Sequence, residues 1–164
     1  MTDMPGGCAC GAIRYRVIEK PLIVHACHCL DCQRHTGSAF VINLWIERKF
    51  VEADVARLET FRMTAGSGEP HDLYYCPDCG IRLWSHYHAA LGDTVLLRAG
   101  TLDDPASVTP DVHIFTRSKL PWVQLPPGAR AYDTMYRLRD VWTDESRARI
   151  KVSIAEKQAR LGSG

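Results

Sequence analysis

Seven cysteines fall into three short clusters along the chain. The clusters are Cys8-x-Cys10, Cys27-x-Cys29-x-x-Cys32 and Cys76-Pro77-Asp78-Cys79-Gly80. A Cys-x-x-Cys-Gly turn lets two thiolates converge on one metal ion, and its glycine permits the tight backbone that follows. The spacing therefore predicts metal binding by the last cluster, and zinc is the metal that paired thiolates commonly hold.

Zinc prefers four ligands in a tetrahedron, so the last cluster needs a second pair of thiolates. We expect the first cluster to supply this pair and to form a structural site, here named the closed cluster: Cys8, Cys10, Cys76 and Cys79. The other three cysteines, here named the triple cluster, are Cys27, Cys29 and Cys32. Three ligands with one open position are typical of a catalytic or substrate-binding zinc, so two zinc ions per chain are predicted. Two alternatives stay open, since a thiol of the triple cluster could complete the first site or the triple cluster could be reduced and metal-free.

The composition excludes several classes of protein. A chain of 164 residues suits one hydrophobic core, and none of its apolar runs reaches the roughly 18 to 20 residues of a membrane-spanning helix. Twenty basic and nineteen acidic side chains give a net charge of +1, which argues against nucleic acid as a partner. The first residues lack the pattern of a secretory signal, and an odd number of cysteines does not suit a disulfide framework. We therefore expect a cytoplasmic protein with no membrane partner, and a homodimer stays open.

Alternating apolar residues predict strands in the middle of the chain. Ile13, Tyr15 and Val17 form one such face, and a second face runs from Phe40 to Ile46. Further strand candidates between glycine and proline clusters cover residues 58–63, 73–75, 82–85, 94–99 and 112–116. Residues 65–70 are expected to form an exposed hairpin loop. The core is therefore predicted to be mostly antiparallel β.

The end of the chain predicts one amphipathic helix over residues 143–161, which contain neither proline nor glycine and precede Gly162. Its apolar face would carry Ile150, Ile154 and Leu161. We expect its basic residues to form one solvated face, made of Arg147, Arg149, Lys151, Lys157 and Arg160. The chain is accordingly divided into a zinc-binding domain, residues 1–142, and a C-terminal helical extension, residues 143–164.

Three motifs carry a resemblance to a known family. They are Gly7-Cys8-Ala9-Cys10-Gly11, Cys27-His28-Cys29-x-x-Cys32-Gln33-Arg34 and Tyr75-Cys76-Pro77-Asp78-Cys79-Gly80, and the later segment Lys119-Leu120-Pro121-Trp122 agrees too. With these motifs in this order and spacing, the chain resembles the glutathione-dependent formaldehyde-activating enzyme and centromere protein V family over roughly residues 6–125.

The resemblance implies a mainly β fold, in which folded-over antiparallel sheets surround zinc knuckles (Mss4-like), with the C-terminal α-helix outside it. It also implies a structural zinc on the closed cluster and a second zinc on the triple cluster. For the formaldehyde-activating members it implies glutathione as cosubstrate. Their reaction forms or cleaves the carbon–sulfur bond of S-hydroxymethylglutathione.

The open position of the triple cluster suits sulfur chemistry. Zinc with three thiolates is a weak Lewis acid that readily takes another soft ligand, and glutathione would supply one. The bound sulfur could then attack the carbonyl carbon of formaldehyde while a nearby group protonates the oxygen. His28 and His35 are the candidate proton donors, and Arg34 and Lys119 are candidates for binding the glutathione carboxylates. Trp122 is expected to anchor the core or to wall the substrate pocket.

Two classes of function follow from these features. The leading one is a zinc-dependent carbon–sulfur lyase that acts on a glutathione adduct of formaldehyde or another small aldehyde, similar to an S-hydroxymethylglutathione synthase. The alternative is a non-catalytic zinc-stabilised binding module. The triple cluster favours the enzyme, because a module needs only the closed cluster, whereas the basic C-terminal helix favours an interaction role. A redox sensor in which the triple cluster forms disulfides ranks third.

Overall fold

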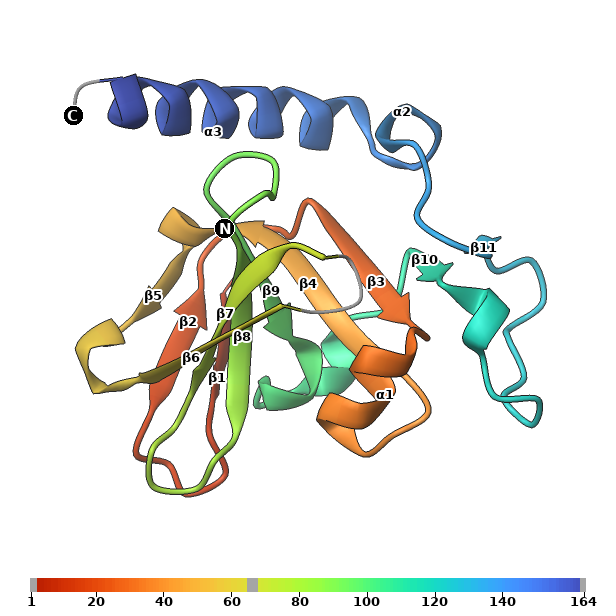
Figure 1. Cartoon of the computed structure of the whole chain (residues 1–164), viewed down its shortest axis with the longest axis horizontal. Coiled ribbons are helices and arrows are strands. Elements are labelled where there is room, and N and C mark those ends of the chain that lie inside the picture. The colour runs from red at the N-terminus through yellow and green to blue at the C-terminus, as the bar shows by residue number, and fades with distance from the viewer. Residues whose placement is uncertain (1–2, 65–67, 163–164) are drawn as a thin grey trace.

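The computed structural model describes residues 3–64 and 68–162, which form two β-sheets with a long helix lying across one end (Figure 1). The smaller sheet has the strand order β1-β2-β5 and comprises β1 (Met4–Gly7), β2 (Arg14–Val17) and β5 (Val51–Ala53). The larger sheet has the order β11-β10-β3-β4-β9-β8-β7-β6. Its strands are β3 (Ile23–Cys27), β4 (Val41–Glu47), β6 (Glu59–Thr64), β7 (Pro70–Tyr75), β8 (Arg82–Tyr87), β9 (Thr94–Arg98), β10 (Val112–Ile114) and β11 (Ala131–Tyr132).

The helices are few among the described residues. The α-helices are α1 (Leu30–Thr36), α2 (Leu138–Val141) and α3 (Asp144–Gly162). Short 3-10 turns connect the strands: η1 (Arg48–Phe50), η2 (Val55–Arg57), η3 (Ala99–Thr101), η4 (Pro105–Ser107) and η5 (Thr116–Ser118). None of the described helices is long and apolar enough to cross a membrane. The predicted mainly β fold with antiparallel sheets and a C-terminal helix is therefore confirmed.

All described strand pairs are antiparallel except the two pairs that β10 forms. Strand β10 pairs in parallel with both β3 and β11, because the chain returns to the edge of β3 by a long crossover instead of a hairpin. The predicted strands all form, with ends shifted by a few residues. Of the predicted loop at residues 65–70, positions 65–67 lie outside the described residues, and Pro70 already pairs with Thr64 as part of β7.

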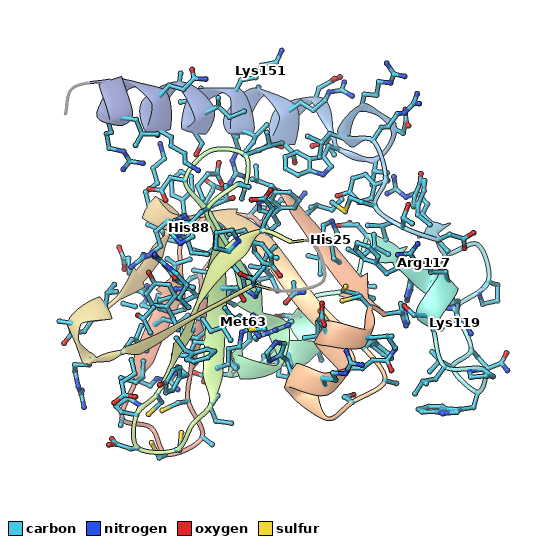
Figure 2. All side chains as sticks on the ribbon, viewed as in Figure 1. His25, Met63, His88, Arg117, Lys119 and Lys151 are labelled. Atoms are coloured by element: carbon cyan, nitrogen blue, oxygen red, sulfur yellow. The ribbon has the colours of Figure 1, made fainter. Side chains whose placement is uncertain are left out.

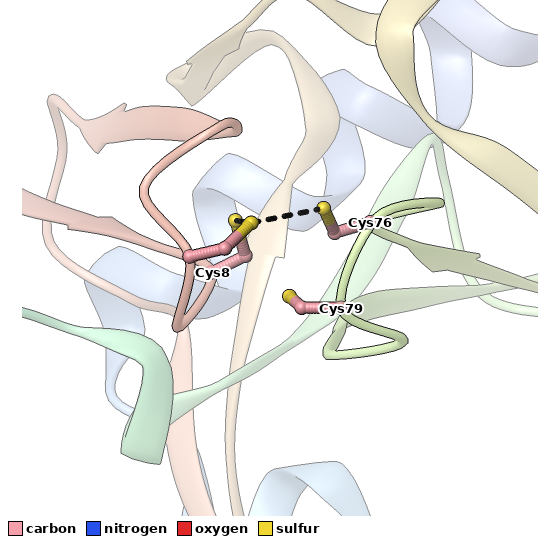
Figure 3. A group of neighbouring side chains, drawn as sticks. Cys8, Cys76 and Cys79 are labelled. Carbon is pink, nitrogen blue, oxygen red and sulfur yellow. Dashed lines mark hydrogen bonds between the residues drawn. The ribbon is translucent and has the colours of Figure 1, made fainter.

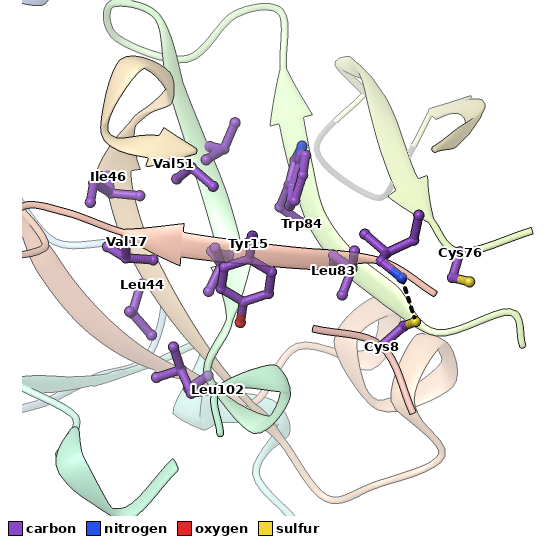
Figure 4. Packing of buried hydrophobic residues seen from close by; sticks show 14 of the residues in the cluster. Cys8, Tyr15, Val17, Leu44, Ile46, Val51, Cys76, Leu83, Trp84 and Leu102 are labelled. Carbon is purple, nitrogen blue, oxygen red and sulfur yellow. Dashed lines mark hydrogen bonds between the residues drawn. The ribbon is translucent and has the colours of Figure 1, made fainter. Parts of the chain in front are cut away.

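The larger sheet uses its two faces differently. On one face Leu44, Ile46 and Leu97 are fully buried against residues of the smaller sheet, such as Tyr15 and Val17 (Figure 4). Because side chains alternate along a strand, the residues between these project from the opposite face. That opposite face carries Asn43 and Trp45 of β4 and Leu96 and Arg98 of β9, which line a cavity described below.

A second hydrophobic cluster connects the edge of the larger sheet to the C-terminal part of the chain. Tyr136, Trp142 and Ile150 pack there with Ile23 and other buried residues. The indole Nε1 of Trp142 donates a hydrogen bond to the Tyr136 hydroxyl at 2.7 Å, and that hydroxyl lies 2.6 Å from Nε2 of His25. Helix α3 thus packs against this second hydrophobic cluster through Ile150.

The basic side chains of α3 correct the prediction of one solvated face. Arg149 binds the buried carboxylate of Glu47 through two hydrogen bonds of 3.0 and 2.6 Å. Lys157 donates to the backbone carbonyls of His88 and Ala90, and Arg160 pairs with Asp93 at 2.8 Å. Lys151 does point outward, away from the sheets (Figure 2).

The apolar residues of α3 also differ from the prediction. Ile150 is buried and Ile154 partly buried, whereas Leu161 is 74% exposed at the end of the helix. Charged contacts therefore contribute to the attachment of α3, because its apolar stripe contacts the body over only part of its length.

We predict that Arg149→Met destabilises the protein by about 3 kcal/mol, because it leaves the Glu47 carboxylate buried without its charged partner. Chemical denaturation measures this change. Arg160→Met is the matched control on the same helix, since its ion pair with Asp93 is mostly exposed and should contribute less than about 1 kcal/mol. Equal losses in both variants would contradict the special role of the Arg149 ion pair.

Candidate metal centres

The closed cluster is built from two hairpin turns, one from each sheet. Cys8 and Cys10 lie in the turn between β1 and β2, and Cys76 and Cys79 lie in the turn between β7 and β8 (Figure 3). The structure thus brings together two pairs of cysteines that are far apart in the sequence, since Cys10 and Cys76 are separated by 66 positions. This is the grouping that the sequence predicts.

Backbone hydrogen bonds shape each turn. In the second turn the N–H of Cys76 donates to the carbonyl of Ile81, and the N–H of Gly80 donates to the carbonyl of Cys76, both at 2.9 Å. Gly80 has φ = 71°, a left-handed conformation that suits glycine. In the first turn the N–H of Ile13 donates to the Cys8 sulfur at 3.2 Å. Donors of this kind stabilise a sulfur that carries negative charge.

The geometry of the closed cluster fits a zinc ion. Four sulfurs on a tetrahedral zinc lie about 3.8 Å apart, given zinc–sulfur bonds of about 2.3 Å. The Cys8 and Cys10 sulfurs are 3.4 Å apart, those of Cys10 and Cys76 are 3.7 Å apart, and all four lie within 4.8 Å of one another. Cys8 and Cys76 also belong to the hydrophobic core, whereas Cys10 is exposed, so a metal here would be covered by protein on its core side.

The triple cluster lies where β3 ends and α1 begins. Cys27 is the last residue of β3, Cys29 is the N-cap of α1, and Cys32 is in the first turn of that helix. The backbone N–H of Cys32 donates to the Cys29 sulfur at 3.3 Å. The three sulfurs also lie within 4.8 Å of one another, which fits a site with three protein ligands.

The three thiols of the triple cluster do not have the same acidity. Hydrogen bonds from Cys27 and Cys32 lower the pKa of the Cys29 thiol, and the same contact with Cys29 raises the pKa of Cys27. The cluster therefore favours one thiolate hydrogen-bonded by two thiols. A metal ion would replace the two remaining protons, as expected for a thiolate site.

A cavity of about 760 Å³ adjoins the triple cluster. All three of its cysteines line the cavity, whereas none of the four cysteines of the closed cluster does. The floor comes from the outer face of the larger sheet and includes Asn43, Trp45, Ser85, Tyr87, Leu96 and Arg98. This volume is within the range of small-molecule sites, so a ligand in this cavity would meet the triple cluster and not the closed cluster.

The two predicted carboxylate-binding residues lie in different places. Arg34 lines the cavity at its rim, where its side chain is 75% exposed and pairs with Asp31 at 3.6 Å. Lys119 is not among the lining residues, because its ammonium donates to the backbone carbonyls of Leu120 and Val123 at 3.3 and 2.7 Å. Lys119 lies on the segment after β10, at the right of Figure 2.

The two predicted proton donors also differ. His28 is fully buried, its Nε2 lies 3.0 Å from Nδ1 of His113, and it does not line the cavity. His35 does line the cavity, and burial lowers the pKa of its imidazole below the usual value. Trp122 is 70% exposed and lines no part of this cavity, so both of its predicted roles are wrong.

Sequence reasoning missed the most buried cations of the cavity. Arg82 and Arg98 line it from β8 and β9, and Tyr87 lies on the same strand as Arg82. The available signal was an arginine at the end of an otherwise apolar strand, as in Arg82-Leu83-Trp84 and Leu96-Leu97-Arg98. Arginine is seldom buried without a specific partner, so this pattern marks a special environment.

A third group of side chains that could bind a metal already contacts the guanidinium of Arg62. Asp72, His86 and His88 approach one another closely. The Arg62 guanidinium, however, binds both oxygens of Asp72 at 2.7 and 3.0 Å and lies 3.2 Å from Nε2 of His88. A divalent ion here would meet a fixed positive charge, so this group is a salt-bridge network.

We predict that Cys76→Ser lowers the midpoint of thermal unfolding by more than about 10 °C, because a structural zinc stabilises the fold directly. Circular dichroism measures unfolding, and elemental analysis measures the zinc content. Wild-type melting with full zinc content would contradict a metal at the closed cluster.

We predict that Cys29→Ala keeps the fold and loses one of two zinc ions per chain, because the triple cluster lies at the border of a cavity and outside the main core. It is the matched control for Cys76→Ser, since both remove one sulfur. A loss of structure as large as in Cys76→Ser would show that the triple cluster is structural.

Comparisons with known proteins identify the family of this chain. The family model described as glutathione-dependent formaldehyde-activating enzyme matches residues 3–118. A Halomonas elongata protein named "Putative glutathione-dependent formaldehyde-activating enzyme" is 27% identical over 164 residues, which cover 97% of this chain and 96% of that protein. A crystal structure of a Rhodobacter sphaeroides protein aligns with a TM-score of 0.48 and 18% identity, covering 65% of this chain and 92% of that one. Because the family model covers most of the chain, including both cysteine clusters, this protein belongs to the glutathione-dependent formaldehyde-activating enzyme family.

Proposed function

We propose that this protein is a zinc-dependent carbon–sulfur lyase that forms and cleaves the adduct of glutathione with formaldehyde or another small aldehyde. The observation that supports this most is the difference between the two clusters. The triple cluster lines a cavity of about 760 Å³, and the closed cluster does not. A binding module would need only the closed cluster for its fold.

The ligands of the two proposed zinc ions are all seven cysteines. A zinc ion on the triple cluster would supply one further coordination position, which suits the soft sulfur of a thiol. The cavity provides the surroundings that such a thiol needs. Its volume suits a molecule of tripeptide size, and its rim carries Arg34 and Arg117, both exposed.

The proposed reaction joins a sulfur to a carbonyl carbon. In the forward direction the thiolate electron pair forms the carbon–sulfur bond, the carbonyl π electrons move to oxygen, and that oxygen takes a proton. In the reverse direction the hydroxyl loses its proton, the carbon–sulfur bond breaks, and the electron pair returns to sulfur. No oxidant or reductant is consumed, which is consistent with a lyase.

Two side chains of the cavity suit the proton transfer. The lowered pKa of His35 makes its imidazole neutral near pH 7, so it can accept the hydroxyl proton during cleavage and return it during formation. Burial raises the pKa of Tyr87 to about 12, so its hydroxyl stays protonated and can donate a hydrogen bond to the developing oxyanion. His28 is not assigned this role, because it does not line the cavity and its buried ring contacts His113.

We also infer a cytoplasmic location and small-molecule partners, a thiol and an aldehyde. The seven cysteines are free of disulfides, and a reducing compartment keeps thiolates available for metal.

The test is the rate of exchange between free glutathione plus formaldehyde and their adduct, followed by NMR. Wild-type protein should accelerate exchange at least about tenfold over the spontaneous rate, since a positioned proton-transfer group alone contributes about 100-fold or more. Cys29→Ala should return the rate to the spontaneous value, and His35→Gln should lower it while zinc and glutathione binding persist. Wild-type exchange at the spontaneous rate would refute the lyase and favour the binding module.

A further inference from the structure

Arg82 and Arg98 line the cavity, and the acidic residues Asp31 and Glu69 line it too. Arg98 is 7% exposed, and its guanidinium donates to the amide oxygen of Asn43 at 2.9 Å. Arg82 contacts the hydroxyl of Ser85 through Nη2. Both of these partners are neutral, and neither arginine forms an ion pair with a described acidic residue.

Arg82 also has unused hydrogen-bond donors. Its Nε and Nη1 atoms are buried and have no hydrogen-bond partner in the described structure. A buried donor without a partner costs free energy, and a charged one costs more, so such groups are uncommon unless a ligand satisfies them. Burial and the neighbouring charge of Arg98 lower the pKa of Arg82 to about 9, which leaves it charged at neutral pH.

The two arginines are close enough to the triple cluster to share one ligand with it. Arg82, Arg98 and Cys32 line the same cavity, and the charges of Arg98 and Cys32 both act on the Arg82 guanidinium. Three thiolates and a divalent ion would carry a net charge of minus one. The lining adds two carboxylates, Asp31 and Glu69, and four guanidinium groups, Arg34, Arg82, Arg98 and Arg117, so its total charge would be plus one. The cavity therefore favours a ligand with a further negative charge.

We propose that Arg82 and Arg98 form a carboxylate-binding subsite for the thiol substrate, whose sulfur binds at the triple cluster. The unused Nε and Nη1 donors of Arg82 lie on different edges of its guanidinium, so each would bind a carboxylate oxygen together with Nη2, whose second proton is not used by Ser85. A guanidinium binds a carboxylate bidentately in either of these two ways. The proposal rests on the proposed function for the identity of the thiol. It assigns the binding of the carboxylate to Arg82 and Arg98, whereas the sequence analysis assigned it to Arg34 and Lys119.

The exposure of each arginine indicates which one contributes more to the affinity for the carboxylate. Arg34 is mostly exposed and already pairs with Asp31, and ion pairs at exposed sites contribute little because water screens them. Arg82 and Arg98 are shielded from water, so a carboxylate that reaches them forms stronger hydrogen bonds.

The test uses three ligands of nearly equal size on the zinc-loaded protein. Glutathione carries the thiol and both carboxylates, glutathione diamide replaces both carboxylates by carboxamides, and S-methylglutathione blocks the thiol. Titration calorimetry gives the three affinities. Wild type should bind the diamide at least about 10-fold more weakly than glutathione, as the loss of a charge-assisted hydrogen-bond pair implies.

Arg82→Met should weaken glutathione about 10-fold and leave the diamide unchanged, so that the preference for the carboxylate is lost. Arg82→Lys should keep part of the preference because it keeps the charge. Arg48→Met is the matched control, since Arg48 is a half-buried arginine outside the cavity, over the Trp84 ring, and should keep the full preference. If Arg82→Met does not fold, the same loss is expected for Arg98→Gln.

The outcomes separate this subsite from the proposed function. Equal binding of glutathione and the diamide by wild type, or an unchanged preference in folded Arg82→Met, would overturn the subsite. Loss of zinc in Arg82→Met with an unchanged preference would also overturn it, since the arginine would then only balance the metal cluster. Equal binding of glutathione and S-methylglutathione would instead refute thiol binding at the triple cluster, while a retained preference over the diamide would still support the subsite.

Discussion

The convergence of two hairpin turns at the closed cluster is the constraint on which the rest of the structure depends. One turn belongs to the smaller sheet and the other to the larger sheet, so four sulfurs fix how the two sheets meet. Cys8 and Cys76 are also part of the core that fills the space between the sheets. A metal bound here would stabilise the packing of both sheets at once, because the ligands come from opposite sides of that core.

This constraint leaves the second face of the larger sheet available for chemistry. Alternation along β4 and β9 directs Leu44, Ile46 and Leu97 into the core and directs Asn43 and Arg98 to the cavity. The cavity is then completed by α1, which carries Cys29 and Cys32 over this face. The closed cluster, which borders the core, and the triple cluster, which lines the cavity, thus lie on different sides of the larger sheet.

The sequence predicted what depends on local spacing. The turn at Cys76 and Cys79, its partner turn at Cys8 and Cys10, and the alternating strands all follow from patterns within a few residues. Helix α1 was missed because it is a single short element, although Gly37 at its end, with φ = 61°, is a stop signal. The depth of Arg82 and Arg98 and the exposure of Trp122 could not be predicted, because they depend on which strands become neighbours and where the cavity forms.

The two clusters differ in their number of sulfurs and in what surrounds them. Four protein sulfurs would complete the tetrahedron of a bound zinc, so the closed cluster would leave no position for a substrate. The triple cluster has three sulfurs and shares its cavity with polar and cationic side chains. The strands that carry these side chains also contribute residues to the hydrophobic core. Arg98 is next to Leu97, and Arg82 is next to Leu83, both of which are fully buried. A substrate bound by these arginines would therefore be held against a rigid support, and positioning it beside the triple cluster would require little reorganisation of the protein.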